Sequence, residues 1–174
     1  MTRVLLFHGS NGSPKDRTAT YLAEHYETYT PSLPTSSYRI SVRIAEESCH
    51  QFKPDVIVAE SFGAALVYEL VQDGAWKGPT VLLCPAIHNV RRSEGLSKYI
   101  RWSSKQPLVV VHGTRDTVIS NDDTERVLNA GDTDTTTLIM VDDDHSMTKI
   151  VDGVTQPQLK DLVDKVAAMS ASRA

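Results

Sequence analysis

The chain has 174 residues, of which 40% are hydrophobic and 23% are charged, and its formal net charge is −4 at pH 7. This composition is typical of a globular protein and excludes the disordered, fibrous and membrane-spanning classes. The acidic balance gives no basic field for a phosphate backbone, so we expect no nucleic-acid partner. One core suffices at this length, and we expect a single domain over residues 1–174.

The N-terminus and the cysteines favour a cytoplasmic protein. The first apolar run, residues 4–7, is too short for a signal-peptide core and far too short to span a bilayer. Cys49 and Cys84 are the two cysteines, and without a secretory signal they are typical of reduced thiols. We therefore expect no membrane insertion.

Five short apolar runs predict strands that are buried on both faces. They lie at residues 4–7, 56–59, 81–84, 108–111 and 138–141. Helical patterns separate most of these runs. The alternation predicts an α/β protein, a three-layer α/β/α sandwich with a mostly parallel sheet of about six strands.

Apolar stripes at helical spacing predict helices over residues 15–27, around residues 66–71 and over residues 156–169. The last of these should cover the final strands of the sheet. Segment 38–53 is ambiguous, because its apolar residues alternate as in a strand and also recur at helical spacing. We favour a helix for it.

Ser61 has the strongest local signal of a catalytic residue. It follows the apolar run 56–59 and has small residues two positions before and after it, Ala59 and Gly63. This strand–turn–helix pattern is that of a nucleophile elbow, which holds a serine in a strained turn where helix and strand approach closely. Glycine is more usual at the position of Ala59. The alternative is that Ser61 only caps the following helix.

Asp116 and His145 supply the two other groups that a catalytic serine needs. Each follows a predicted strand in a polar loop, where catalytic residues of open α/β sheets gather. Histidine takes the proton of the serine, and an acid fixes the orientation of the histidine. The order serine, aspartate, histidine along the chain is the order found in α/β hydrolases. Alternatively, Asp116 only shapes its own turn.

Five other histidines compete for the role of the base. His25 and His50 fall in helical patterns. His8 and His112 precede glycines at strand ends, and we interpret them as loop-shaping residues. His88 lies in a segment that we consider below as part of a pocket.

The loop at residues 8–14 predicts an oxyanion hole. Its glycines let the backbone approach the serine, and we expect the N–H groups of Ser10 and Phe62 to stabilise the oxyanion, by about 3 to 4 kcal/mol for each donor. The alternative is a phosphate-binding turn before the next helix. Neither of the glycine-rich nucleotide motifs is present, which disfavours that alternative.

The acidic residues before His145 contain possible metal ligands. The spacing of Asp142, Asp143, Asp144 and His145 matches neither a calcium loop nor a zinc helix. We interpret the run as a solvated acidic turn whose charge raises the basicity of His145. We expect no metal and no cofactor.

With these motifs in place, the chain resembles the α/β-hydrolase family, in particular its small bacterial serine esterases of the YqiA-like kind. The resemblance covers most of the chain and rests on His8-Gly9, Asn11-Gly12-Ser13-Pro14, Pro31-Ser32-Leu33-Pro34, Glu60-Ser61-Phe62-Gly63, Leu83-Cys84-Pro85-Ala86, Gly113-Thr114-Arg115-Asp116 and Asp144-His145-Ser146-Met147. It implies a minimal α/β-hydrolase domain over residues 1–174 and a second strand that starts near Glu27. It also implies a serine esterase that cleaves small acyl esters.

The expected substrate is a small-molecule acyl ester, hydrolysed through an acyl-enzyme intermediate. The segment between Pro85 and Pro107 is too short for a lid domain, so we expect an open site. The candidate pocket residues are Glu60, Met147, His88, Tyr99, Ile100 and Trp102. A triad serves an esterase, a thioesterase and an amidase alike, and an idle hydrolase-fold binding protein is the alternative from another class. The sequence does not indicate an oligomeric state.

Overall fold

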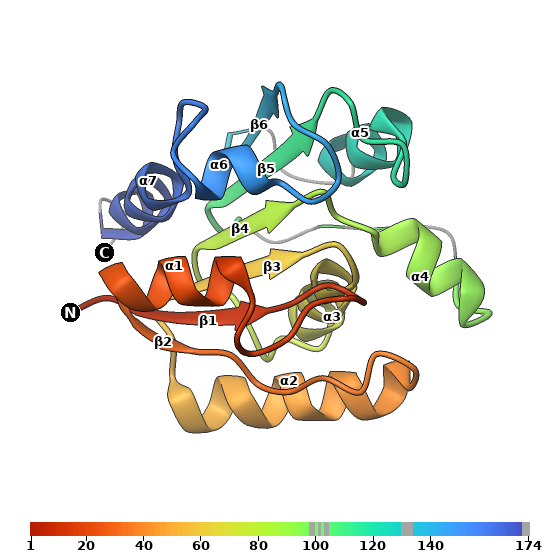
Figure 1. Cartoon of the computed structure of the whole chain (residues 1–174). Helices are drawn as coiled ribbons and strands as arrows, with labels where there is room; N and C mark the ends of the chain where they lie inside the picture. Colours follow the sequence, from red (N-terminus) through yellow and green to blue (C-terminus); the bar gives the residue numbers. More distant parts are fainter. Residues whose placement is uncertain (98–99, 101, 103–104, 130–133, 172–174) are drawn as a thin grey trace.

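The computed structural model describes residues 1–97, 100, 102, 105–129 and 134–171. Its centre is a six-stranded sheet in the order β2-β1-β3-β4-β5-β6, and all neighbouring strands are parallel (Figure 1). The strands are β1 (Arg3–Phe7), β2 (Glu27–Tyr29), β3 (Val56–Glu60), β4 (Thr80–Leu83), β5 (Leu108–Gly113) and β6 (Thr136–Val141). The predicted parallel sheet is therefore confirmed, including a second strand that begins at Glu27.

Helices flank the sheet on both faces (Figure 1). They are α1 (Arg17–His25), α2 (Tyr38–Phe52), α3 (Phe62–Gln72), α4 (Ile87–Ser93), α5 (Asn121–Asn129), α6 (Thr148–Val151) and α7 (Leu159–Ala171). Within the described ranges, we find no helix whose length and apolar character would suffice to cross a bilayer.

The two faces of the sheet belong to two separate cores. In β1, Leu5 and Phe7 pack with residues of α2 and α3, whereas Val4 and Leu6 pack with residues of α1, α6 and α7. Successive side chains of a strand point to opposite faces, so a strand between two helical layers must be apolar throughout. This is why the strands appear in the sequence as continuous apolar runs, and it confirms the three-layer architecture.

The ambiguous segment 38–53 is the helix α2, as we favoured. A strand would place Tyr38 and Ile40 on one face, but Tyr38 is buried and Ile40 is 51% exposed. The buried residues of α2 are three or four positions apart along one face: Tyr38, Ser41, Ala45, Ser48 and Cys49. Of the two patterns in this segment, the helical spacing therefore predicts the structure correctly.

The position of the closing helix differs from the prediction. α7 packs against β3, β4 and β5, so it covers the middle of the sheet and not its edge at β6. The middle strands are buried except for Glu60 at the end of β3, whereas most residues of β6 are only partly buried. The apolar stripe of α7 removes more apolar surface from water over the middle strands, which explains its position.

The parallel sheet brings its carboxyl ends to one edge. The chain leaves β1, β3, β4, β5 and β6 at this edge, where ligands bind in open α/β sheets. The residues that follow these strands include the loop at residues 8–16 and Ser61, Cys84, Asp116 and His145. Residues far apart in the sequence thus come together.

Candidate active site

Ser61 occupies a strained turn between β3 and α3. Its backbone has φ 46° and ψ −107°, a conformation that residues other than glycine rarely adopt. Ser61 is the residue that precedes α3, yet its side chain makes no capping hydrogen bond to the helix. The capping alternative therefore does not describe what the hydroxyl does in this structure.

Ser61, His145 and Asp116 form a continuous chain of hydrogen bonds. Nδ1 of His145 lies 2.8 Å from Oδ2 of Asp116, and Nε2 of His145 lies 3.0 Å from Oγ of Ser61. An ionised carboxylate only accepts, so Nδ1 carries the proton and Nε2 accepts from the serine hydroxyl. The side chain of Asp116 is fully buried and that of His145 is 25% exposed. This is the arrangement that an activated serine requires.

Asp116 both shapes its turn and orients His145. Its Oδ1 accepts from the backbone N–H groups of Val118 and Ile119, at 2.8 and 2.9 Å, while Oδ2 faces His145. Burial by itself would raise the pKa of Asp116. The backbone N–H groups of Ile119 and Val118 and the side chains of His145 and Cys84 outweigh the burial, and the pKa lies below its ordinary value. Asp116 is therefore held as a carboxylate.

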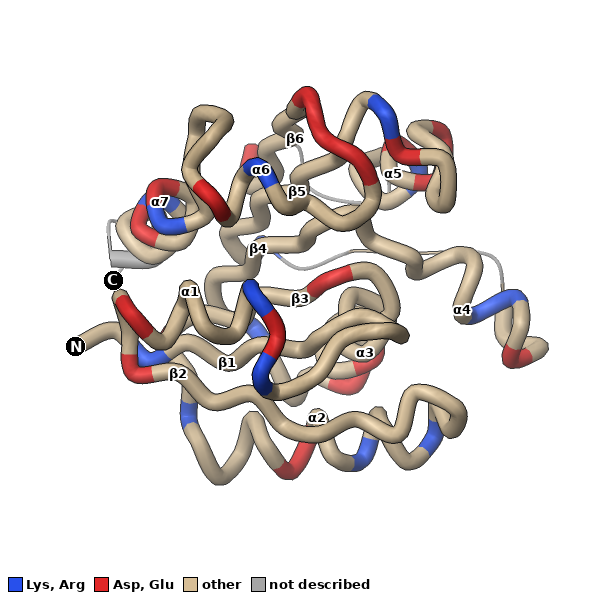
Figure 2. Tube along the Cα trace, viewed as in Figure 1, with Lys and Arg blue, Asp and Glu red and all other residues tan. Residues whose placement is uncertain are grey.

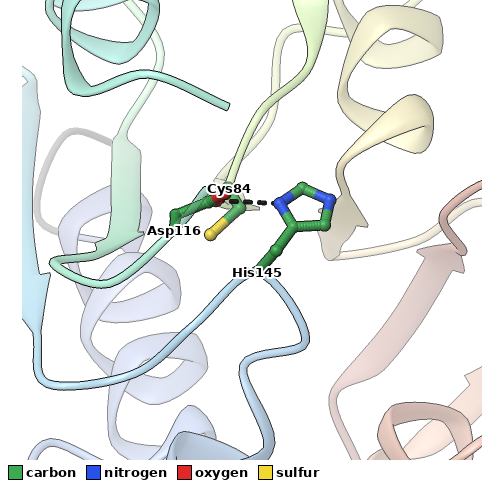
Figure 3. Close-up of side chains that lie close together, drawn as sticks. All are labelled: Cys84, Asp116 and His145. Carbon is green, nitrogen blue, oxygen red and sulfur yellow. Dashed lines mark hydrogen bonds and ion pairs between the residues drawn. The ribbon is translucent and has the colours of Figure 1, made fainter. Parts of the chain in front are cut away.

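Cys84 is a further neighbour of this chain of hydrogen bonds. It follows β4 in a left-handed conformation, with φ 43°, and its thiol is one of the groups that lower the pKa of Asp116. Figure 3 shows Cys84 close to the carboxylate of Asp116, which is joined to the ring of His145. Sγ of Cys84 and ligand atoms of Asp116 and His145 lie within 4.8 Å of one another, which is close enough for one metal ion. Burial raises the pKa of the thiol, so it stays protonated and is a poor thiolate ligand.

His112 is the nearest competing base, and the structure gives it a different environment. It is fully buried on β5, and its Nδ1 lies 2.7 Å from Oγ1 of Thr124. Its Nε2 is 3.9 Å from Oδ2 of Asp116, too far for a hydrogen bond. Burial lowers the pKa of His112, with a smaller opposing effect from Asp116. His112 is therefore an uncharged, buried neighbour of Asp116 and does not hydrogen-bond to it.

The acidic residues before His145 hold its loop in place. Asp143 is buried, and its carboxylate accepts from the backbone N–H groups of Asp144, Lys149 and Ile150. Asp142 binds the side chain of Arg115 at 2.8 Å and that of Lys149 at 3.0 Å. We predicted a solvated acidic turn for this run. Asp143 differs from that prediction, because its carboxylate is buried and binds backbone N–H groups. Figure 2 shows this acidic segment after β6.

The loop after β1 passes directly over the serine. A methyl group on Gly9 would lie 3.5 Å from Cβ of Ser61. Nε2 of His8 accepts from the N–H of Leu33, so its Nδ1 carries the proton and donates to the carbonyl of Gly9 at 2.8 Å. His8 thereby ties the loop to the segment after β2, in agreement with its interpretation as a loop-shaping residue.

The two expected oxyanion donors lie beside Ser61. Phe62 is the first residue of α3, where helical N–H groups have no partner within the helix. Ser10 lines the same pocket as Ser61. Neither backbone N–H donates to another described residue. Their use as an oxyanion hole stays a prediction.

A pocket of about 750 Å³ opens over Ser61 and His145. Two of the predicted pocket residues, Glu60 and Met147, line it. Trp102 does not, because it is 1% exposed and packs in the core with Tyr68. His88 on α4 and Ile100 are also absent from the described lining, and Ile100 packs against the same core. Tyr99 lies outside the described residues.

Glu60 is the unusual member of the pocket. Its Oε1 accepts from the hydroxyl of Thr18 on α1, at 2.5 Å. Burial raises the pKa of Glu60 to about 7, an effect that the hydrogen bond from Thr18 opposes and the charge of Asp16 reinforces. A carboxyl group that titrates near neutral pH beside a candidate nucleophile is a candidate functional group.

Sequence reasoning missed Cys84, Thr18 and Asp143 as parts of the site. Cys84 had a usable signal, because it is the last residue of the predicted strand 81–84 and so lies at the same edge of the sheet as Ser61, Asp116 and His145. Asp143 lies between two other aspartates, and the sequence does not indicate which of the three is buried. Thr18 gave no signal, since its contact with Glu60 depends on how α1 packs.

The sequence matches no protein-family model and no curated protein. Solved structures do match the fold. Est1E from Butyrivibrio proteoclasticus has a TM-score of 0.72 at 13% identity, with 98% of this chain and 87% of that chain covered. The alpha/beta hydrolase domain-containing protein 10 from mouse has a TM-score of 0.70 at 11% identity, covering 94% and 90%. An alpha-beta serine hydrolase homologue from Coxiella burnetii has a TM-score of 0.66 at 14% identity, covering 95% and 85%.

These likenesses extend over nearly the whole chain, with identities too low to show more than the fold. The chain has the α/β-hydrolase fold, as the sequence motifs predicted. The likeness to YqiA-like esterases in particular stays a prediction.

Proposed function

We propose that this protein is a serine hydrolase of small acyl esters, with Ser61 as nucleophile, His145 as general base and Asp116 as its orienting acid. The observation that carries the proposal is the chain of hydrogen bonds at 3.0 and 2.8 Å through His145. A fold by itself does not imply a function, so the proposal rests on this site. The names of the structural neighbours, among them a serine hydrolase homologue, agree with the reaction class.

The first half of the reaction transfers the acyl group to the enzyme. Oγ of Ser61 attacks the ester carbonyl while its proton moves to Nε2 of His145. The carbonyl oxygen becomes an oxyanion, which the N–H groups of Ser10 and Phe62 stabilise. When the tetrahedral intermediate collapses, the bond to the alcohol breaks and the alcohol leaves with the proton from His145.

The second half releases the acid. Water gives a proton to Nε2 of His145 and attacks the acyl-enzyme carbonyl, and the same backbone donors stabilise the second oxyanion. Collapse breaks the bond to Ser61, whose Oγ regains the proton from His145. Asp116 keeps its negative charge throughout and stabilises the imidazolium that forms twice in the cycle.

The pocket supports a small-molecule substrate. Its volume of about 750 Å³ lies within the range of sites that enclose small organic ligands. Leu83, Val118, Met147 and Val151 give it apolar surface for an acyl chain or an alcohol. The side chain of His145 is 25% exposed, so water can reach it for the second half of the reaction.

The test is turnover of p-nitrophenyl esters from acetate to octanoate, with the matching thioesters and anilides as comparison. We expect ester turnover by the wild type and a loss of at least about 1,000-fold in kcat for Ser61→Ala. Ser93→Ala, which removes an exposed hydroxyl on α4, is the matched control and should retain activity. Turnover that Ser61→Ala retains, or none by the folded wild type on any substrate, would refute the proposal.

A further inference from the structure

Glu60 presents one free carboxyl oxygen to the pocket of Ser61. Its Oε1 is used by Thr18, and Oε2 makes no hydrogen bond to a described residue. Oε2 is also not among the enclosed side-chain atoms that lack a partner, so it faces the open volume of the pocket. Glu60 and Ser61 are neighbours in the chain, with Cα atoms about 3.8 Å apart. Both residues line the same pocket, so a group bound by Glu60 lies close to the scissile bond.

The other charges of the pocket leave this carboxyl group without a cation. Asp16 caps α1 and accepts from the N–H groups of Ser13 and Ala19. Arg17 is the one lysine or arginine in the described lining, and it pairs with Asp152. Figure 2 shows these alternating charges before α1 and the acidic end of β3.

The remaining acid of the lining adds to the negative potential. Asp144 is directed to the backbone and side chain of Ser146. The pocket thus contains the carboxyl groups of Asp16, Glu60 and Asp144 against a single arginine whose side chain is already paired. A negatively charged pocket attracts positively charged ligands and repels negatively charged ones.

A partly buried carboxylate without a cation is costly, and a bound cation reduces that cost. We propose that Glu60 selects substrates that carry a cationic ammonium group next to the ester. The proposal rests on the proposed function, because it assigns the substrate class of the same site. Uncharged esters remain substrates, but slower ones, and esters with a carboxylate in the same place are rejected.

The ammonium group binds the ionised form of Glu60, so the selectivity depends on pH. The pKa of Glu60, raised to about 7 by burial, places this change between pH 6 and pH 8. The charged groups that face it are Asp16 and Arg17 from α1, and Asp144 and His145 from the loop after β6. His145 acts as the base for every ester, so its contribution cancels in the ratio of kcat/KM between two esters.

The experiment compares esters of nearly equal shape that differ in charge. In the acyl series these are ethyl 3-aminopropanoate, ethyl butanoate and monoethyl succinate, which end in an ammonium, a methyl and a carboxylate group. In the alcohol series they are choline butanoate and its neutral analogue, 3,3-dimethylbutyl butanoate. The two series show whether the ammonium group belongs to the acid or to the alcohol.

We expect kcat/KM to be about 10-fold higher for the cationic ester than for the neutral one in at least one series at pH 8. The ratio falls toward 1 at pH 6 in the wild type, and it is near 1 at both pH values in Glu60→Gln. Glu24→Gln, which removes an exposed charge of α1, is the matched control and keeps the wild-type ratio.

A ratio near 1 in the wild type in both series, or a ratio that Glu60→Gln leaves unchanged, would overturn the inference. The fall of the ratio with pH needs no variant, so it decides the matter even if Glu60→Gln folds poorly. Hydrolysis of the neutral esters tests the proposed function separately. Neutral esters that are cleaved without charge selectivity leave the proposed function intact, whereas no hydrolysis in either series removes both.

Discussion

Gly63 packs against the backbone of Phe7 so closely that no side chain fits between them. A methyl group at Gly63 would lie 2.2 Å from the carbonyl oxygen of Phe7. Backbone atoms of a central strand cannot move aside without disturbing the sheet, so the elbow depends on a glycine here. Ala59, on the other side of Ser61, is buried in the core with its methyl group accommodated. The elbow thus needs a glycine after the serine and not before it.

Gly63→Ala should therefore destabilise the protein by about 3 kcal/mol, at the upper end of the usual cost of overpacking. Gly95→Ala is the comparison, because a methyl group there meets nothing within 4 Å and the only strain is its φ of 67°. We expect that change to cost about 1 kcal/mol. Urea unfolding measures both. Equal costs for the two variants would contradict the close approach at Gly63.

Asp116→Asn should lower kcat by about 1,000- to 10,000-fold while the protein stays folded, because an amide does not hold His145 in the required tautomer or stabilise its charged form. Steady-state kinetics on the best ester checks this. Asp122→Asn on the exposed face of α5 serves as the control and should leave kcat unchanged. A loss of less than 10-fold in Asp116→Asn would mean that Asp116 only shapes its turn.

Cys84 is one of the groups that keep Asp116 ionised, and we expect a moderate effect from its removal. Cys84→Ala removes the thiol that helps to lower the pKa of Asp116 and should lower kcat about 5-fold, in line with the loss of one hydrogen bond of about 1 kcal/mol. Cys84→Ser restores a donor and should recover most of that loss. Cys49→Ala removes the other buried thiol and should have no effect on kcat. Equal rates for the alanine and serine variants would show that the hydrogen bond is unimportant.

Glu60 should make the folded protein less stable as the pH rises. Folding raises the pKa of this carboxyl group from 4.5 to about 7, so the folded state binds the proton more tightly than the unfolded state does. The stabilising contribution is present below pH 4.5 and is lost as the pH rises through 7. We expect the wild type to lose about 3 kcal/mol relative to Glu60→Gln between pH 4.5 and 8. Parallel stability curves in urea unfolding would show that Glu60 is not shifted.

The sequence predicted the strands well because buried parallel strands leave continuous apolar runs, and it located Ser61, Asp116 and His145 because each follows such a run. The residues that line the pocket were harder to predict. Its aromatic ring makes Trp102 a candidate for the pocket wall, but Trp102 is buried against Tyr68 of α3, a contact that its own sequence position does not indicate. The environment of Glu60 likewise depends on Thr18, which is 42 positions away in the chain. Such contacts come from packing between elements, which local patterns do not encode.

The central claim is that His145 activates Ser61. Its most direct test is covalent labelling of the purified protein with a fluorophosphonate, read by intact mass and peptide mapping, because the reagent reacts with activated serines and needs no knowledge of the substrate. The claim predicts a single adduct on Ser61 that is absent in Ser61→Ala and strongly slowed in His145→Ala. A folded wild-type protein that forms no adduct, or one that labels equally in His145→Ala, would contradict it.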